Sequence, residues 1–75
     1  MQVIPTYARF LPERMRPRLA AQFLDMGVST LWDRVKNDPD CPQGYHEGRI
    51  RYFDTVDLQA YAARLKARAL DHAAA

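Results

Sequence analysis

The sequence predicts a mainly α-helical domain with one small β-hairpin, and three observations support this fold class. The chain has 75 residues, which is enough for one core and one domain. Apolar residues make up 48% and charged residues 27%, a balance typical of folded chains rather than disordered ones. Two segments with helical spacing of apolar residues precede an alternating segment, and a third helical pattern follows it.

Residues 1–13 contain Pro5 and Pro12 and show no clear period, so we expect an extended N-terminal arm. The segment RMRP, residues 14–17, alternates briefly and is compatible with a short strand. We expect the folded domain to span residues 14–70, and residues 71–75, which end in three alanines, to form a frayed tail.

The first helix is predicted to begin at Pro17, because the missing N–H of proline has no partner in a first turn anyway. Ala20, Phe23 and Leu24 follow at helical spacing and indicate about two turns, which Gly27 is expected to end. A second helix is predicted over residues 28–37. Its inward stripe is apolar: Val28, Leu31, Trp32 and Val35. Its outward face is polar: Ser29, Thr30, Asp33, Arg34, Lys36 and Asn37.

A loop, a hairpin and a long helix are predicted after residue 37. Prolines, aspartates and a glycine crowd the segment NDPDCPQG and predict a loop, in which Asp38 and Asp40 make local hydrogen bonds. The segment YHEGRIRYF alternates around Gly48, which suits a tight turn, so Tyr45 is expected to face Ile50 or a neighbour. The last helix follows Asp54. Its apolar positions have helical spacing: Leu58, Tyr61, Leu65 and Ala69.

Two short helices joined by a glycine turn and followed by a hairpin are typical of a winged helix-turn-helix, whose second helix enters the DNA major groove. Residues 14 to 65 also resemble the AlpA-type and excisionase-type proteins of phages and integrative elements, which are similar to the DNA-binding half of MerR regulators. The positions that match the family pattern are Ala21, Leu24, Ser29, Thr30, Leu31, Val35, Lys36, Pro42, Gly48, Arg49, Phe53, Asp54 and Leu58. Asp25 stands where the family has its turn glycine, and Asp33 where arginine is frequent.

The polar face of the second helix holds the first candidate DNA contacts. Ser29 and Thr30 lie in its first turn, where hydroxyls and free N–H groups can hold a phosphate or simply cap the helix. Asp33 can accept a hydrogen bond from cytosine N4, position Arg34 or Asn37, or be merely solvated. Arg34 and Lys36 can meet phosphates or form a solvated flank. Trp32 is expected in a half-core position.

The predicted hairpin carries the second set of candidate contacts. Arg49 and Arg51 are two residues apart, so we expect them on one strand face, reaching into a minor groove or protecting an edge strand with charge. Arg16 and Arg18, with Arg14, are weaker candidates for flanking phosphates, and a solvated basic arm also explains them. The cations of the last helix are expected to serve solubility: Arg64, Lys66 and Arg68.

Catalysis and metal binding find little support in the sequence. His46 and His72 lie in different predicted elements, and Cys41 with His46 gives one ligand pair where a closed site needs two. We therefore expect no enzyme activity, no metal, no cofactor and no small-molecule ligand. A single cysteine and the lack of an apolar run of about 20 residues favour a cytoplasmic protein without a membrane partner, and the resemblance implies a bacterial, nucleoid-associated one.

Two functional hypotheses follow. The first is a sequence-specific DNA-binding protein. The resemblance implies that it acts as an excisionase, a recombination directionality factor that binds and bends attachment-site DNA cooperatively, by head-to-tail self-association, with a tyrosine recombinase as partner. A transcriptional regulator of the AlpA type is the alternative within this class. The second hypothesis is a phage packaging or assembly module that uses the same fold to bind protein.

Overall fold

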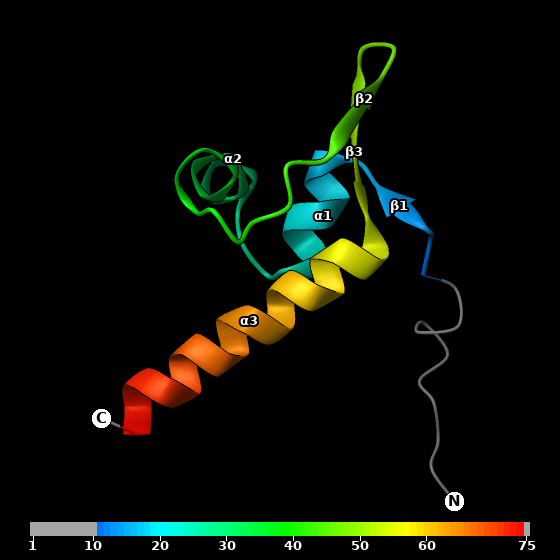
Figure 1. Ribbon diagram of the computed structural model, residues 1–75. Helices are drawn as coiled ribbons and strands as arrows, with labels where there is room; N and C mark the ends of the chain where they lie inside the picture. Colours follow the sequence, from blue (N-terminus) through cyan, green and yellow to red (C-terminus); the bar gives the residue numbers. More distant parts are fainter. Residues whose placement is uncertain (1–10, 75) are drawn as a thin grey trace, which may run out of the picture.

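The computed structural model describes residues 11–74, which form a small mixed α/β domain (Figure 1). Its elements in chain order are β1 (Arg14–Met15), α1 (Pro17–Phe23), α2 (Val28–Asn37), β2 (Tyr45–Glu47), β3 (Ile50–Asp54) and α3 (Thr55–Ala74). The described residues thus contain three helices and one three-stranded antiparallel sheet. This arrangement is compatible with the predicted helix-turn-helix and hairpin.

The sheet has the strand order β1-β3-β2, with β3 in the centre. Tyr45 was predicted to face Ile50 or a neighbour, and in the hairpin it pairs with Tyr52. Met15 pairs with Phe53 on the other side of β3. Both the hairpin and the short first strand were predicted and are confirmed. Because side chains alternate along a strand, Phe53 points to one face of the sheet and Tyr52 to the other.

The turn between α1 and α2 differs from the prediction. Helix α1 ends at Phe23, before Gly27, and the chain reverses at Asp25, whose φ of 56° lies in the left-handed region. The N–H of Met26 donates to the carbonyl of Ala21 (2.9 Å) and that of Asp25 to Gln22 (3.0 Å), which is the Schellman pattern of helix ends. Aspartate tolerates this conformation better than most residues. Gly27 is instead the extended N-cap of α2, with φ −71°.

The core lies where α1, α2, α3 and the sheet meet. Its buried members are Met15, Ala20, Ala21, Leu31, Phe53 and Leu58. The predicted inward stripe of α2 is buried only in part: Leu31 is fully buried, whereas Val28 and Trp32 are 42% and 39% exposed. A core this small covers the middle of α2 but leaves its edges in contact with solvent.

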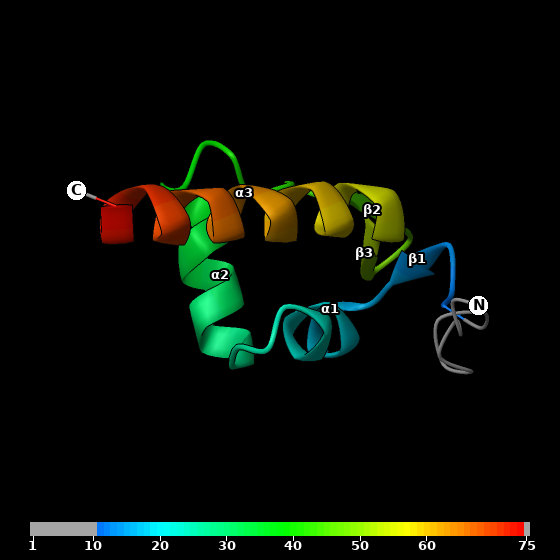
Figure 2. The same cartoon turned by 90° about the horizontal axis from the view of Figure 1, so that it is seen from below.

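Helix α3 is the longest element, and its first half packs on the core. Leu58 and Tyr61 are buried as predicted, Leu65 is half-buried and Ala69 is exposed. The helix continues to Ala74, past the boundary at residue 70 where the tail was expected. Figures 1 and 2 show the second half of α3 running beyond the sheet and past α2.

Residues 1–10 of the predicted arm lie outside the described residues. Residues 12 and 13 are bound to the domain, because the N–H of Thr55 donates to the carbonyl of Glu13 (2.9 Å) and the Thr55 hydroxyl donates to that of Pro12. Between residues 11 and 74, none of the helices combines the length and the apolar character needed to cross a membrane.

Candidate nucleic-acid interface

Helix α2 exposes a broad polar arc. Successive residues of an α-helix are rotated by about 100°. This rotation places three exposed residues at the centre of the arc: Ser29, Asp33 and Lys36. Thr30 and Asn37 lie on one side of the centre and Trp32 on the other. The predicted outward face of α2 is therefore confirmed, with Arg34 at its boundary because that side chain is half-buried.

The first turn of α2 has no side-chain cap. Its N-cap is Gly27, and no capping hydrogen bond from a side chain is formed there. The alternative in which Ser29 and Thr30 serve as caps is therefore wrong, since both lie inside the helix and are exposed. Their hydroxyls stand beside first-turn N–H groups, the arrangement that attracts an anion.

Asp33 and Asn37 form a pair on this arc. The Asn37 amide donates from Nδ2 to Asp33 Oδ1 at 2.9 Å, one helical turn away. Of the roles considered for Asp33, the structure therefore supports positioning of Asn37. The second carboxylate oxygen of Asp33 forms no hydrogen bond or ion pair with any described residue, so it can still accept one from a ligand.

The hairpin borders the arc at Trp32. The Trp32 ring lies 6.2 Å from the Phe53 ring, tilted by 54°, and the Arg51 guanidinium stands 5.3 Å from the Trp32 ring centre. Trp32 was predicted in a core or half-core position, but it is exposed and only its ring contact with Phe53 ties it to the core. This stacking joins α2 to the face of β3 that carries Arg51 and Phe53.

Arg51 also links the hairpin to the loop after α2. Its Nε donates to the Gln43 carbonyl at 2.9 Å, and its second nitrogen donates to the same oxygen. The side chain of Gln43 in turn donates to the Val35 carbonyl at 2.8 Å, on α2. Arg51, Gln43 and Trp32 therefore form a bridge that holds the hairpin against α2.

Arg49 differs from Arg51, against the prediction that both project from one strand face. Arg49 lies in the turn between β2 and β3, is exposed and makes no ion pair with any residue in the described range 11–74. Arg51 is half-buried and engaged by Gln43 and Trp32. The turn ends before residue 50, so only Arg51 belongs to the strand.

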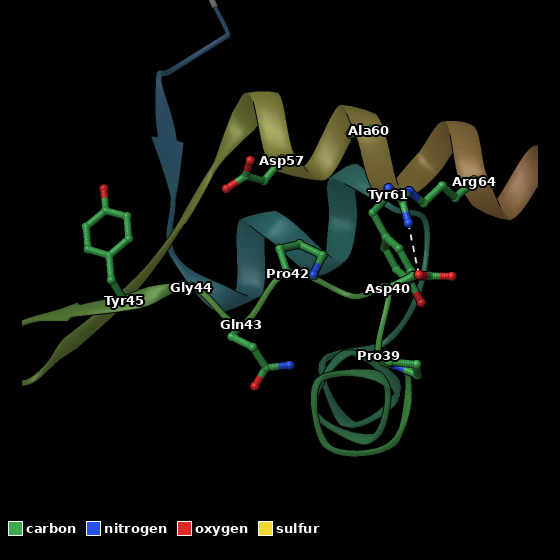
Figure 3. Close-up of a pocket in the computed structure, with 10 residues that line it drawn as sticks. All are labelled: Pro39, Asp40, Pro42, Gln43, Gly44, Tyr45, Asp57, Ala60, Tyr61 and Arg64. Atoms are coloured by element: carbon green, nitrogen blue, oxygen red, sulfur yellow. Dashed lines mark hydrogen bonds and ion pairs between the residues drawn. The ribbon is translucent and has the colours of Figure 1, made fainter.

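A charge network borders the arc on its other side, at the end of α2. Asp38 accepts a hydrogen bond from the Tyr61 hydroxyl (2.7 Å) and two from Arg68 (2.7 and 2.9 Å). Asp40 accepts one from Arg64 at 2.9 Å, as the dashed line in Figure 3 shows. The prediction that Arg64 and Arg68 serve solubility is therefore wrong, because both fasten the loop to α3.

The network changes the acidity of its members. Hydrogen bonds from Arg68 and Tyr61 hold the pKa of Asp38 well below its usual range. Burial, together with the Asp38 carboxylate, raises the pKa of Tyr61 to about 12. Burial also raises the pKa of the Cys41 thiol, which keeps that thiol neutral and poorly nucleophilic.

The remaining candidate arginines lie in β1 and at the start of α1. Arg14 stands over the Tyr52 ring, 3.9 Å from its centre, and pairs with Glu47. Arg16 and Arg18 are exposed near the start of α1. Arg14 is therefore turned away from Trp32 by the sheet, whereas Arg16 and Arg18 lie at the N-terminal end of α1.

No group of three or more His, Cys, Asp or Glu side chains within residues 11–74 suits a metal ion. Cys41 is buried, and its thiol contacts the Pro42 carbonyl at 3.6 Å. The hollow drawn in Figure 3 lies between the loop and α3, and the Arg64–Asp40 pair bridges it. Asp40 and Arg64 are thus engaged in holding the loop.

Models of known protein families, characterised proteins and solved structures were each compared with the chain, and none matches it. Three geometric features of the described residues bear on function: an exposed polar helix arc, a hairpin fixed beside it, and an exposed arginine in the hairpin turn.

Proposed function

We propose that this chain is a sequence-specific DNA-binding protein with a winged helix-turn-helix fold. Helix α2 is the recognition helix and the β2–β3 hairpin is the wing. The observation that carries the proposal is the exposed arc of α2, centred on Ser29, Asp33 and Lys36, beside a hairpin that Trp32 and Arg51 tie to it.

The chemistry of the arc supports this proposal. A major groove about 12 Å wide accepts one helix whose outer side chains meet base edges and phosphates. Ser29 and Thr30 offer hydroxyls at the helix start, and Lys36 offers an exposed cation. Asn37 and Asp33 supply the donors and acceptors that base edges require. The exposed Arg49 in the turn suits a narrow minor groove or a phosphate beside it.

The resemblance to AlpA-type and excisionase-type proteins supports a biological role on a phage or integrative element. In that role the protein acts as a recombination directionality factor, and several copies bind and bend attachment-site DNA to promote excision by a tyrosine recombinase. One copy neutralises only a few phosphates, so its affinity is modest and strongly salt-dependent. Control of a promoter is the second candidate within the same class.

The test is a gel-shift titration on DNA from around the gene and from the nearest attachment site, at two salt concentrations with unrelated competitor. We expect discrete complexes that resist competitor and weaken as salt rises. Lys36→Ala should weaken them, whereas Lys66→Ala on the exposed surface of α3 is the matched control and should change little. A smear, or equal loss in both variants, would contradict the proposal.

Excision is tested separately from binding. A plasmid that carries the two attachment sites is incubated with the recombinase, with and without the protein, and recombined product is measured. Product that depends on the protein supports the directionality role. Specific binding without such an effect, together with altered transcription from a nearby promoter, would favour the regulator.

A further inference from the structure

A second surface with binding character lies at the β1 edge of the sheet, beside α1. It is a hollow between β1, β3 and α1, which we name the arginine-rimmed hollow. Its rim consists of Arg14, Arg16 and Arg18, and its apolar floor includes Leu19 and Tyr52. None of the side chains that line it is acidic.

Strand alternation turns Tyr52, which lines this hollow, away from the proposed DNA-binding face. Arg51 and Phe53 of β3 contact Trp32 of α2. Tyr52 lies between them in sequence and therefore points to the opposite face, where Arg14 covers its ring at 3.9 Å. A duplex seated on α2 and the hairpin turn leaves Tyr52 and Arg14 uncovered.

The hollow combines charge with an exposed apolar side chain. Arg16 and Arg18 are exposed and form no ion pair within residues 11–74, while Arg14 is partly neutralised by Glu47. Leu19 is 44% exposed at the floor. A phosphate backbone gains nothing from an exposed leucine, whereas a peptide can bury an apolar side chain against it and place carboxylates on the arginines.

We propose that the arginine-rimmed hollow docks an acidic segment of a partner protein that carries a large apolar side chain. The position of this surface away from the DNA rests on the proposed function, and the docking itself does not. Residues 1–10 of this chain contain Arg9 and no acidic residue, so their charge does not match the rim. The molecule thereby joins DNA and protein through two different surfaces.

The experiment uses the full chain and a displayed library of random 12-residue peptides, followed by titration of labelled selected peptides. We expect enrichment of peptides that combine Asp or Glu with Leu, Ile, Phe or Trp. The double variant Arg16→Ala/Arg18→Ala should bind these peptides about tenfold more weakly, as expected when charge-assisted contacts are lost. Leu19→Ser should also weaken them. Circular dichroism establishes that each variant is folded.

Arg49→Ala is the matched control, because it removes an exposed arginine from the proposed DNA-binding surface. It should leave peptide affinity unchanged and weaken DNA binding. Arg16→Ala/Arg18→Ala should weaken peptide binding and leave DNA affinity unchanged. Absence of acidic peptides among those selected, or unchanged peptide affinity in the double variant, overturns the docking site. Equal losses of DNA affinity in both variants would make the rim a phosphate contact and also overturn it. Peptide docking without DNA binding in any variant would instead refute the proposed function alone.

Discussion

The loop over residues 38–44 and the turn of the hairpin are both short, polar and rich in charge, yet their side chains are held very differently. Asp38, Asp40 and Gln43 of the loop bind α3 or α2 through hydrogen bonds. Gly48 and Arg49 of the turn are exposed, and Arg49 has no ion-pair partner within the described residues. The comparison shows that charge alone does not mark a binding surface. Charges satisfied by the fold position α2, and charges left free are available to a ligand.

Two glycines give the sharpest test of this contrast. Gly44 ends the loop with φ 71°, and a Cβ there would lie 2.5 Å from the Tyr52 carbonyl oxygen. Gly48 in the turn has φ 63° but nothing within 4 Å. Gly44→Ala should lower the free energy of unfolding by about 3 kcal/mol through combined strain and clash, and Gly48→Ala by about 1 kcal/mol. Urea unfolding measures both. Equal effects would refute the difference between the loop and the turn.

Substitutions at two tyrosines are expected to change the free energy of unfolding by a smaller amount. The Tyr61 side chain is buried and its hydroxyl donates to Asp38 at 2.7 Å, whereas that of the exposed Tyr45 donates to Asp54 at 3.1 Å. Tyr61→Phe should lower the free energy of unfolding by about 1–2 kcal/mol, because a hydrogen bond to a carboxylate is lost. Tyr45→Phe should change it by less than about 0.5 kcal/mol. Thermal unfolding followed by circular dichroism compares the two, and a larger effect at Tyr45 would reverse the assignment.

The pH dependence of the free energy of unfolding tests the role of Asp38 in holding the loop. Its pKa in the folded protein is depressed by Arg68 and Tyr61, so its contribution is present above the unfolded value of about 3.9. That contribution is lost as the pH falls through roughly 4 toward the folded pKa, because the unfolded chain then binds the proton first. Asp38→Asn should flatten the fall in stability between pH 6 and pH 3, whereas Asp71→Asn on the exposed end of α3 should leave it unchanged. An unchanged slope in Asp38→Asn would refute this role.

The sequence predicted the helices and strands better than the tertiary contacts between them. The spacing of apolar residues placed α2 over Val28–Asn37, as observed, because helical periodicity is a local property. The turn at Asp25 was missed, because the expectation relied on glycine for a left-handed residue that aspartate also adopts. No local pattern reveals that Arg68 binds Asp38, since the two are 30 residues apart.

In the candidate site, too, the sequence predicted the helix face but not the tertiary contacts. The exposed arc of α2 followed from its periodicity, but the roles of Arg49 and Arg51 did not. Their spacing suggested one strand face, whereas the turn includes Arg49 and leaves Arg51 stacked on Trp32. Which arginine is free depends on where the turn begins and on what packs beside the strand, and both are set by tertiary contacts.

The smallest expected effect separates these two arginines. Arg49→Ala should weaken DNA binding about threefold to tenfold and reduce the slope of log affinity against log salt by about one, as expected when one phosphate contact is lost. Arg51→Ala should leave that slope unchanged, because Arg51 is engaged by Gln43 and Trp32. It should instead alter the fluorescence of Trp32, the single tryptophan, in the free protein. A reduced slope in Arg51→Ala together with altered Trp32 fluorescence would mean that Arg51 leaves the bridge to contact DNA, and the hairpin would then be held to α2 only when the protein is free.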